Sequence, residues 1–344
     1  MARQFLPPPS DDSDSDPSSY NHTHHPSSSD DEDDVCIDET DVVEVPANEI
    51  PGYFLERGGR LFHSYGNCPY PLPVDADEQQ RQKGLHELVR RLVGGPVVQL
   101  VHQLLAFAPG EQPRVLDLGT GTGQWTLDMA QRFPHARFYG VDIVPIATRY
   151  PPANVMFEIH DITQRSRYAT ASIDLVHARS VTLAVRHYDA LVAEAARVLR
   201  PGGLFISAEW ARSPTLADDG DLAARAPRTH AFVAAVNEAL RARGLHTLAH
   251  AIPGVLQDSR RFADVGREHC TVPVGDWHPD PAQRELGRRY RELAAEYARG
   301  MREMLAQGRF AARVDELVQG YIEEMWTVDG MVATLTVAYA RRMP

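Results

Sequence analysis

The chain has 344 residues, with 47 acidic and 35 basic side chains and a formal net charge of −12. Residues 1–50 hold 14 of the acids against a single Arg, a net −13, which leaves 33 acidic and 34 basic groups in the rest of the chain. This nearly neutral remainder argues against a nucleic-acid-binding surface, and no apolar run approaches the roughly 18 residues of a membrane span.

The first 48 residues are rich in Ser, Pro, His and Asp and contain few large apolar side chains. Such a composition cannot offset the entropy lost on ordering, so we predict a disordered acidic tail over 1–48 that is available to protein partners. Its sign is opposite to that of a secretory or mitochondrial presequence. This predicts an intracellular protein, cytoplasmic or also nuclear.

Residues 49–110 are predicted to form a separate extension. Residues 51–77 are dense in Tyr, Phe, Gly and Pro and show too little apolar periodicity for a regular element. Helices are expected over about 77–93, where apolar residues recur at i, i+3, i+4 and i+7, and over about 97–107. We interpret this extension as a helical lid.

From residue 113 onward, apolar strands alternate with amphipathic helices, which is typical of a parallel sheet covered on both faces. The strands expected are 114–118, 137–141, 156–160, 173–177 and 204–209, with helices over 124–133 and 187–199. The crossover after the second strand is short and proline-rich, so its helix is expected to be truncated or absent.

The C-terminal elaboration, 211–344, is predicted to contain helices over 228–243, 254–266, 283–305 and 309–325 and strands over 269–276 and 332–340. The Tyr and Met residues spaced along 290–304 are expected to be core rather than a substrate pocket, although Met suits an adaptable wall. The whole domain is taken as 111–344.

The most informative string is VLDLGTGTG at 115–123, an apolar strand that runs into a glycine loop and then a helix. Glycine permits a sharp turn and close approach of a ligand to the backbone, and the N–H groups of the next helix face that ligand. Asp142 ends the next strand, where a carboxylate suits the two hydroxyls of a ribose.

The glycine spacing separates two cofactor classes. Dinucleotide loops read G-x-G-x-x-G, whereas this chain reads G-x-G-x-G with Asp117 inside the turn. A carboxylate there repels a pyrophosphate but accepts hydrogen bonds from a cationic amino acid moiety. The loop therefore favours S-adenosylmethionine over a nicotinamide cofactor.

Residues 113–210 resemble the core of the class I S-adenosylmethionine-dependent methyltransferases. VLDLGTGTG, the acid ending YGVD, HDI at 160–162, IDLVHARS and VLRPGGLFISAEW are similar to five motifs of that family, in the same order. The resemblance implies an α/β, Rossmann-like sheet of seven strands with helices on both faces.

The flanks are similar to the fungal LaeA-type methyltransferase-like proteins, which are associated with regulation of secondary metabolism and with tailoring methylation. The similar segments are Y-P-L-P-x-D-x-x-E-x-x-R, starting at Tyr70, and the run over 263–287. This resemblance covers about 51–344.

The resemblance implies roles for individual residues. Those expected to bind the cofactor are Asp117, Gly119, Thr120, Gly121, Gly123, Asp142, Ile143, Asp161, Ile162, His177 and Arg179. Asp117 would anchor the amino group directly or through water, Asp142 the ribose, and Asp161 the adenine amine.

The acceptor side is less determined, and no dedicated base stands out. The candidates for a catalytic role are His187, Tyr188, Glu209, Tyr65 and His86, and no metal is expected. Cys36, Cys68 and Cys270 lack the spacing of a zinc site or a disulfide framework.

Two functions remain open. The first is methyl transfer to a small secondary metabolite or to a protein. The alternative is a regulatory or scaffold protein that keeps the fold and acts through partner contacts.

Overall fold

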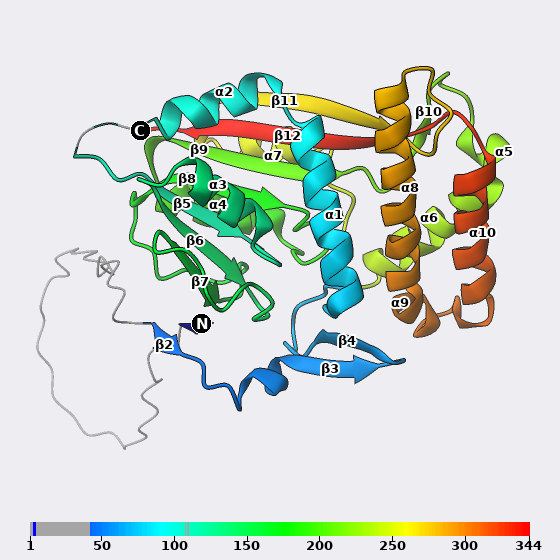
Figure 1. The fold of residues 1–344 in the computed structure, drawn as a ribbon, viewed down its shortest axis with the longest axis horizontal. Helices are drawn as coiled ribbons and strands as arrows, with labels where there is room; N and C mark the ends of the chain where they lie inside the picture. Colours follow the sequence, from blue (N-terminus) through cyan, green and yellow to red (C-terminus); the bar gives the residue numbers. More distant parts are fainter. Residues whose placement is uncertain (1–2, 5–41, 107, 109) are drawn as a thin grey trace, which may run out of the picture.

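The computed structural model describes residues 3–4, 42–106, 108 and 110–344. Its centre is one ten-stranded sheet in which neighbouring strands follow the order β10-β12-β9-β8-β5-β6-β7-β1-β2, with β11 paired to β12 (Figure 1). The strands are β1 (Arg3–Gln4), β2 (Val43–Glu44), β5 (Arg114–Leu118), β6 (Arg137–Asp142), β7 (Val155–Ile159), β8 (Ile173–Arg179), β9 (Leu199–Trp210), β10 (Thr215–Leu216), β11 (Phe262–Pro273) and β12 (Met331–Arg342).

The strands β5 to β9 are mutually parallel, whereas β12 runs antiparallel to both β9 and β11. Parallel strands are covered on both faces and therefore read as continuous apolar runs, as the five buried residues of β7 do. The order β7-β6-β5-β8-β9-β12-β11 confirms the predicted seven-stranded core. Because β5 to β9 share a direction, their carboxyl ends meet at one edge of the sheet.

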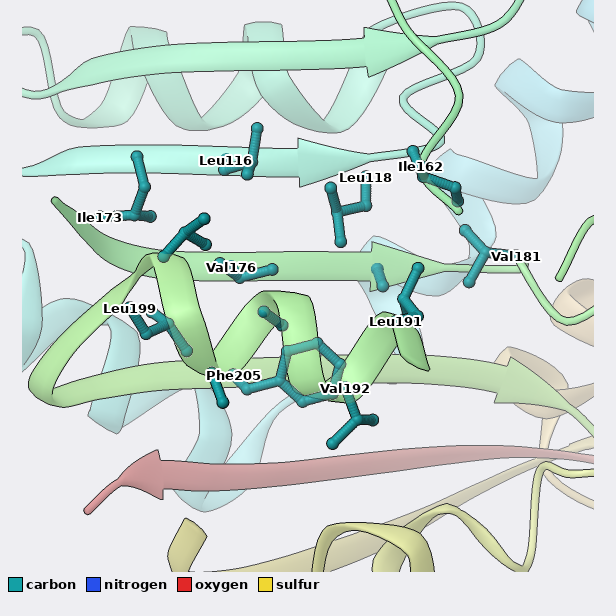
Figure 2. Close-up of a cluster of buried hydrophobic side chains, with 14 of the residues drawn as sticks. Leu116, Leu118, Ile162, Ile173, Val176, Val181, Leu191, Val192, Leu199 and Phe205 are labelled. Carbon is teal, nitrogen blue, oxygen red and sulfur yellow. The ribbon is translucent and has the colours of Figure 1, made fainter. Parts of the chain in front are cut away.

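Helices cover both faces of this core. On one face α4 (Tyr188–Val198) and α7 (Ile252–Asp258) bury side chains against β5, β8 and β9, and Figure 2 shows Leu191 and Val192 of α4 over Val176 and Phe205. The other face packs against α1 (Ala76–Leu92), α2 (Gly95–Leu104) and α3 (Gln124–Arg132).

The C-terminal segments build a helical layer beside the sheet. Helix α8 (Pro281–Gly300) lies next to α10 (Val314–Thr327), and α6 (Pro227–Arg241) packs against α10 (Figure 1). Three short helices complete it, namely α5 (Leu222–Arg225), α9 (Arg302–Ala306) and the 3₁₀ helix η3 (Ala311–Arg313). These helices share one apolar core with β11 and β12. No helix in the described part of the chain is both long and apolar enough to cross a membrane.

The segment before α1 differs from the prediction. A 3₁₀ helix, η2 (Ile50–Tyr53), leads into a hairpin of β3 (Phe54–Arg57) and β4 (Arg60–His63) where no regular element is expected. The turn consists of Gly58 and Gly59, both with positive φ. A Gly-Gly pair between two short β-prone runs is a hairpin signal. Apolar periodicity does not detect it, because each strand has only four residues.

Two other expectations differ in detail. The helix predicted over 254–266 ends at Asp258, and residues 262–266 already belong to β11 because β12 offers them a partner strand. Residues 3–4 and 43–44 lie in the predicted disordered tail, yet β1 pairs with β7 and β2 with β1. Residues 5–41 lie outside the described residues. The absence of a helix between β6 and β7 is confirmed.

Candidate functional site

The glycine loop between β5 and α3 has a backbone that only glycine adopts easily. Gly119, Gly121 and Gly123 have φ values of +67°, +55° and +76°. A Cβ atom on Gly119 would lie 2.8 Å from Cγ1 of Val181. The loop shape therefore depends on glycine, and the backbone of Gly119 and Gly121 forms part of a cavity wall.

Asp117 braces this loop from within β5. Its Oδ2 atom accepts hydrogen bonds from the hydroxyls of Thr120 and Thr126, each at 2.7 Å, and its Oδ1 atom lies 2.7 Å from Nδ1 of His177. Burial, the largest single influence, would raise the pKa of Asp117, but the hydrogen bond and charge of His177 and the hydrogen bonds from Thr126 and Thr120 together outweigh it, and the pKa lies below its usual value. Both oxygens of Asp117 accept hydrogen bonds from the protein. The predicted contact of Asp117 with a cofactor amino group stays a prediction.

Asp142 joins the end of β6 to the same loop. Its Oδ2 atom accepts a hydrogen bond from Gly121 N–H at 2.8 Å and its Oδ1 atom one from Val144 N–H at 3.2 Å. Burial raises its pKa to about 6. The carboxylate is thus held at the cavity wall beside Ile143, which also lines the cavity.

Asp161 and Ile162 follow the end of β7 and line the cavity next to Asp142. The Oδ1 atom of Asp161 accepts hydrogen bonds from the N–H and the hydroxyl of Thr163, at 2.9 and 2.7 Å. Its Oδ2 atom makes no hydrogen bond to any residue that the structure describes. Ile162 is buried and presents an apolar surface.

His177 and Arg179, at the end of β8, lie in the wall beneath the loop. The ring of His177 stacks on that of Trp125, with centroids 3.7 Å apart and planes 7° apart. Arg179 approaches Nδ1 of His86 at 3.2 Å, while Nε2 of His86 lies 2.9 Å from Oδ2 of Asp128. Burial and the Arg179 charge lower the pKa of His86. A neutral His86 that accepts from Arg179 and donates to Asp128 satisfies both contacts.

Glu209, near the end of β9, faces the same cavity. One oxygen accepts hydrogen bonds from Val181 N–H at 2.7 Å and Thr182 N–H at 3.3 Å, and the other accepts from the Thr182 hydroxyl at 2.7 Å. Burial, opposed by these hydrogen bonds, raises the pKa of Glu209 to about 7. At neutral pH this carboxyl group therefore exchanges a proton readily.

The remaining wall comes from the C-terminal helices. Tyr290, Leu293, Ala294 and Tyr297 of α8 and two residues of α10, Tyr321 and Met325, line the cavity. The expectation that the 290–304 stripe is core is therefore right for Met301 and Met304, which are buried among apolar side chains, and wrong for the two tyrosines. A helical stripe alone does not reveal whether it faces a core or a hollow.

These strand ends and helices surround one cavity of about 260 Å³, and of the predicted cofactor-binding residues Gly123 is not in its wall. Glu209 and His86 line it, whereas the other three catalytic candidates do not. Tyr188 is buried and its hydroxyl lies 2.7 Å from Oγ of Ser207, His187 is exposed just before α4, and Tyr65 accepts a hydrogen bond from Gln164. The structure therefore does not bring these three to the cavity.

The cavity residues that the sequence does not point to include Arg212, Tyr321 and Gln82. Arg212 lies two residues after the end of β9, and the carboxyl ends of strands in an open α/β sheet are where ligands bind. That position was a usable signal. Tyr321 and Gln82 carried no such signal, because their place depends on how α10 and α1 pack.

The residues at the strand ends fit the predicted cofactor chemically. Asp142 and Asp161 offer carboxylate oxygens suited to ribose hydroxyls and an adenine amine. Ile143 and Ile162 offer apolar surface for a flat base, and the Gly119–Gly121 backbone leaves room where a Cβ would intrude. Within the described residues, no three His, Cys, Asp or Glu side chains gather to hold a metal ion.

Comparison with known proteins finds similar methyltransferases. Residues 86–250 match the family model described as a methyltransferase domain. Three curated fungal proteins align with most of this chain. The secondary metabolism regulator laeA of Aspergillus flavus is 30% identical over 71% of this chain and 64% of its own length, and methyltransferase pytC of Aspergillus terreus is 29% identical over 67% and 69%. The protein-methionine methyltransferase laeA of Emericella nidulans is 29% identical over 71% and 63%.

The chain thus spans less than two thirds of the length of the two laeA proteins. The matches confirm the methyltransferase domain expected from the motifs and, with it, S-adenosylmethionine as the cofactor.

Proposed function

We propose, on the premise that this chain carries a class I methyltransferase domain related to laeA and pytC, that it transfers a methyl group within the cavity described above. One observation carries the proposal. The glycine loop and the strand-end carboxylates share a single cavity with Glu209, a buried carboxyl group whose pKa lies near neutrality. A cofactor subsite and a proton acceptor are therefore contiguous.

In this proposal the strand-end residues hold the cofactor. Asp142 accepts hydrogen bonds from the ribose, Asp161 from the adenine amine, and Ile143 and Ile162 pack on the base. His177 and Arg179 lie beneath the methionine portion. S-adenosylmethionine, when bound, supplies a methyl group activated by its sulfonium charge.

The protein then has to orient the acceptor and remove its proton. Glu209 is the proposed base, because the other cavity-lining candidate, His86, is engaged by Arg179 and Asp128 at both ring nitrogens. The Thr182 hydroxyl and two backbone N–H groups fix the Glu209 carboxylate, so it meets the acceptor in one orientation. α1 contributes Arg81, Gln82 and Leu85 to the wall of the cavity.

Calorimetric titration of the full chain with S-adenosylmethionine tests the cofactor subsite. We expect 1:1 binding and at least tenfold weaker binding by Asp142→Ala. The control, Asp258→Ala, replaces an exposed carboxylate at the end of α7 and should bind as the wild type does. No binding by the wild type, or equal binding by both variants, contradicts the proposal.

The acceptor is proposed to be a small molecule or a protein side chain. One relative is named a protein-methionine methyltransferase, which makes a thioether acceptor a specific case to test. Incubation with methyl-labelled S-adenosylmethionine, followed by mass spectrometry of the protein and of added metabolite extract, separates the two. Label on the chain or on a partner protein supports a protein acceptor, and label in the small-molecule fraction supports a metabolite.

A second candidate function is favoured by the name of the Aspergillus flavus relative, a secondary metabolism regulator. In this case the fold acts through partner contacts. Gly121→Arg distinguishes the two, because it places a side chain at a positive φ beside Gln82 and abolishes the cofactor subsite. Metabolite profiles that are unchanged by a stably folded Gly121→Arg protein would favour the regulatory function.

A further inference from the structure

The half of the cavity away from the glycine loop is rich in hydrogen-bond donors. Tyr70, Tyr290, Tyr297 and Tyr321 line it, and none of their hydroxyls has a hydrogen-bond partner in the described part of the chain. Burial raises the pKa of each of these tyrosines, for Tyr297 to about 12. All four therefore remain protonated and able to donate at neutral pH.

Arg212 adds a cation to the same wall. Its Nη2 atom donates to the carbonyl oxygen of His246 at 2.6 Å, whereas its Nη1 atom is buried without a partner. No Asp or Glu of the described residues lies within 4 Å of it, and burial lowers its pKa. The indole N–H of Trp210, two residues earlier, is also buried and unpartnered. Trp210 and Arg212 both line the cavity through other atoms of their side chains or backbone.

Among the described residues, no other charged group around this half forms an ion pair with Arg212. Arg81 forms a two-point ion pair with Glu78, at 2.7 and 2.8 Å, so those charges cancel locally. Glu209 attracts Arg212 through its charge but forms no ion pair with it, and its oxygens accept hydrogen bonds from Val181 and Thr182. Buried charges without partners are destabilising, and an anionic ligand in the cavity would offset the charge of Arg212.

The shape of the wall indicates the rest of the ligand. The ring of Tyr290 lies 5.1 Å from that of Trp210, and the guanidinium of Arg81 lies 5.9 Å from the Tyr297 ring. With Met325 and Leu293 they present flat and apolar surfaces. Such walls suit a planar apolar body that carries oxygen atoms for the tyrosine hydroxyls.

We propose that the methyl acceptor is an aromatic carboxylate, held by Arg212 through its carboxylate group and enclosed by Trp210, Tyr290 and Tyr297. This inference rests on the proposed function and specifies the class of molecule that the site takes. Arg212 is then a specificity-determining residue. It selects an anion and leaves Glu209 to meet the reacting atom.

Matched probe pairs test this on the full chain saturated with S-adenosylhomocysteine. The probes are benzoate, 2-naphthoate and anthracene-2-carboxylate, each compared with its neutral carboxamide, and calorimetry measures their dissociation constants. At least one carboxylate should bind at least tenfold more tightly than its amide. Arg212→Gln should abolish that ratio and Arg212→Lys should retain part of it. Arg288→Gln, an exposed position on α8, should behave as the wild type.

The titration with S-adenosylhomocysteine separates the possible failures. Loss of its binding by the wild type contradicts the proposed function itself. Normal binding of S-adenosylhomocysteine together with no bound carboxylate, equal affinity for acid and amide, or an unchanged ratio in a folded Arg212→Gln protein, contradicts only the assignment of the acceptor. Preference for the amides contradicts it as well.

Discussion

Asp142 is the residue whose protonation should most directly affect the cofactor subsite. Because its pKa is raised to about 6, the carboxylate is charged at pH 8 and largely protonated below about pH 6. Losing a charge-assisted hydrogen bond removes about 1.5–3 kcal/mol, roughly a 10- to 100-fold loss of affinity.

The affinity of the wild type for S-adenosylmethionine should therefore fall as the pH drops through about 6. Asp142→Asn should bind more weakly at pH 8 and show a flatter profile. Calorimetry over pH 5–8 measures both. Parallel pH profiles for the two proteins would show that Asp142 is not the group responsible.

The raised pKa of Glu209 predicts how the stability of the protein varies with pH, whatever the acceptor is. Its pKa in the folded chain is about 7, above the ordinary 4.5 of a glutamate. A raised pKa means that the folded state binds the proton of Glu209 more tightly than the unfolded state does. The contribution of Glu209 to stability is therefore greatest below pH 4.5 and is lost as the pH rises to about 7.

The difference in unfolding free energy between Glu209→Gln and the wild type should therefore grow by about 3 kcal/mol in favour of Gln from pH 4.5 to pH 7. Urea titrations of both proteins at several pH values measure it. A difference that does not vary with pH would assign Glu209 an ordinary pKa and remove the argument for a base.

At the scale of single residues, most of the predicted cofactor-binding residues line the cavity, whereas only two of the five catalytic candidates, Glu209 and His86, do so. Gly119, Asp142 and Asp161 lie at or just after the carboxyl ends of β5, β6 and β7, whose place in a parallel sheet follows from local pattern. Arg212 and Tyr321 line the same cavity only because the fold brings α10 and the segment after β9 to its wall. A long-range contact of this kind leaves no periodic trace in the sequence.

At the scale of elements, α8 positions the aromatic wall and depends on one glycine for its distance from the sheet. A Cβ on Gly287 would overlap the carbonyl oxygen of Gly275 and lie 3.0 Å from that of Pro273. Gly287→Ala should push α8 away from the end of β11 and destabilise the protein by about 1–3 kcal/mol.

The matched control is Gly254→Ala in α7, where an added Cβ meets nothing within 4 Å. Because alanine favours a helix, this change should be neutral or stabilise by up to about 1 kcal/mol. Urea unfolding compares the two. Equal effects would show that α8 has room to accept the extra methyl group.

The elements also show where apolar periodicity does not predict structure. The strands and helices of 113–210 are predictable because each is long and patterned. The strands of the β3–β4 hairpin, four residues each, are too short to show alternation. The start of β11 is a strand and not the predicted helix because β12, about 70 residues later, supplies its partner.

At the scale of the whole molecule, the acidic segment is expected to take no part in cofactor binding. Among the described residues the first that lines the cavity is His63, whereas residues 1–41 hold 12 of the acidic side chains against one Arg. Removal of residues 1–41 should therefore leave the affinity for S-adenosylmethionine within about twofold of that of the full chain. A tenfold loss in a calorimetric titration would show that the tail contributes to cofactor binding.

The position of β12 has a consequence for biosynthesis. This strand lies between β9 and β11, yet in the chain it comes after every other described element. Until it emerges from the ribosome, β11 lacks its partner and β9 has an open edge, which is a site for pairing with another nascent chain. Chaperones that shield exposed strand edges should therefore associate with ribosome-bound chains that end before residue 331 and should release them once residues 331–342 have been added.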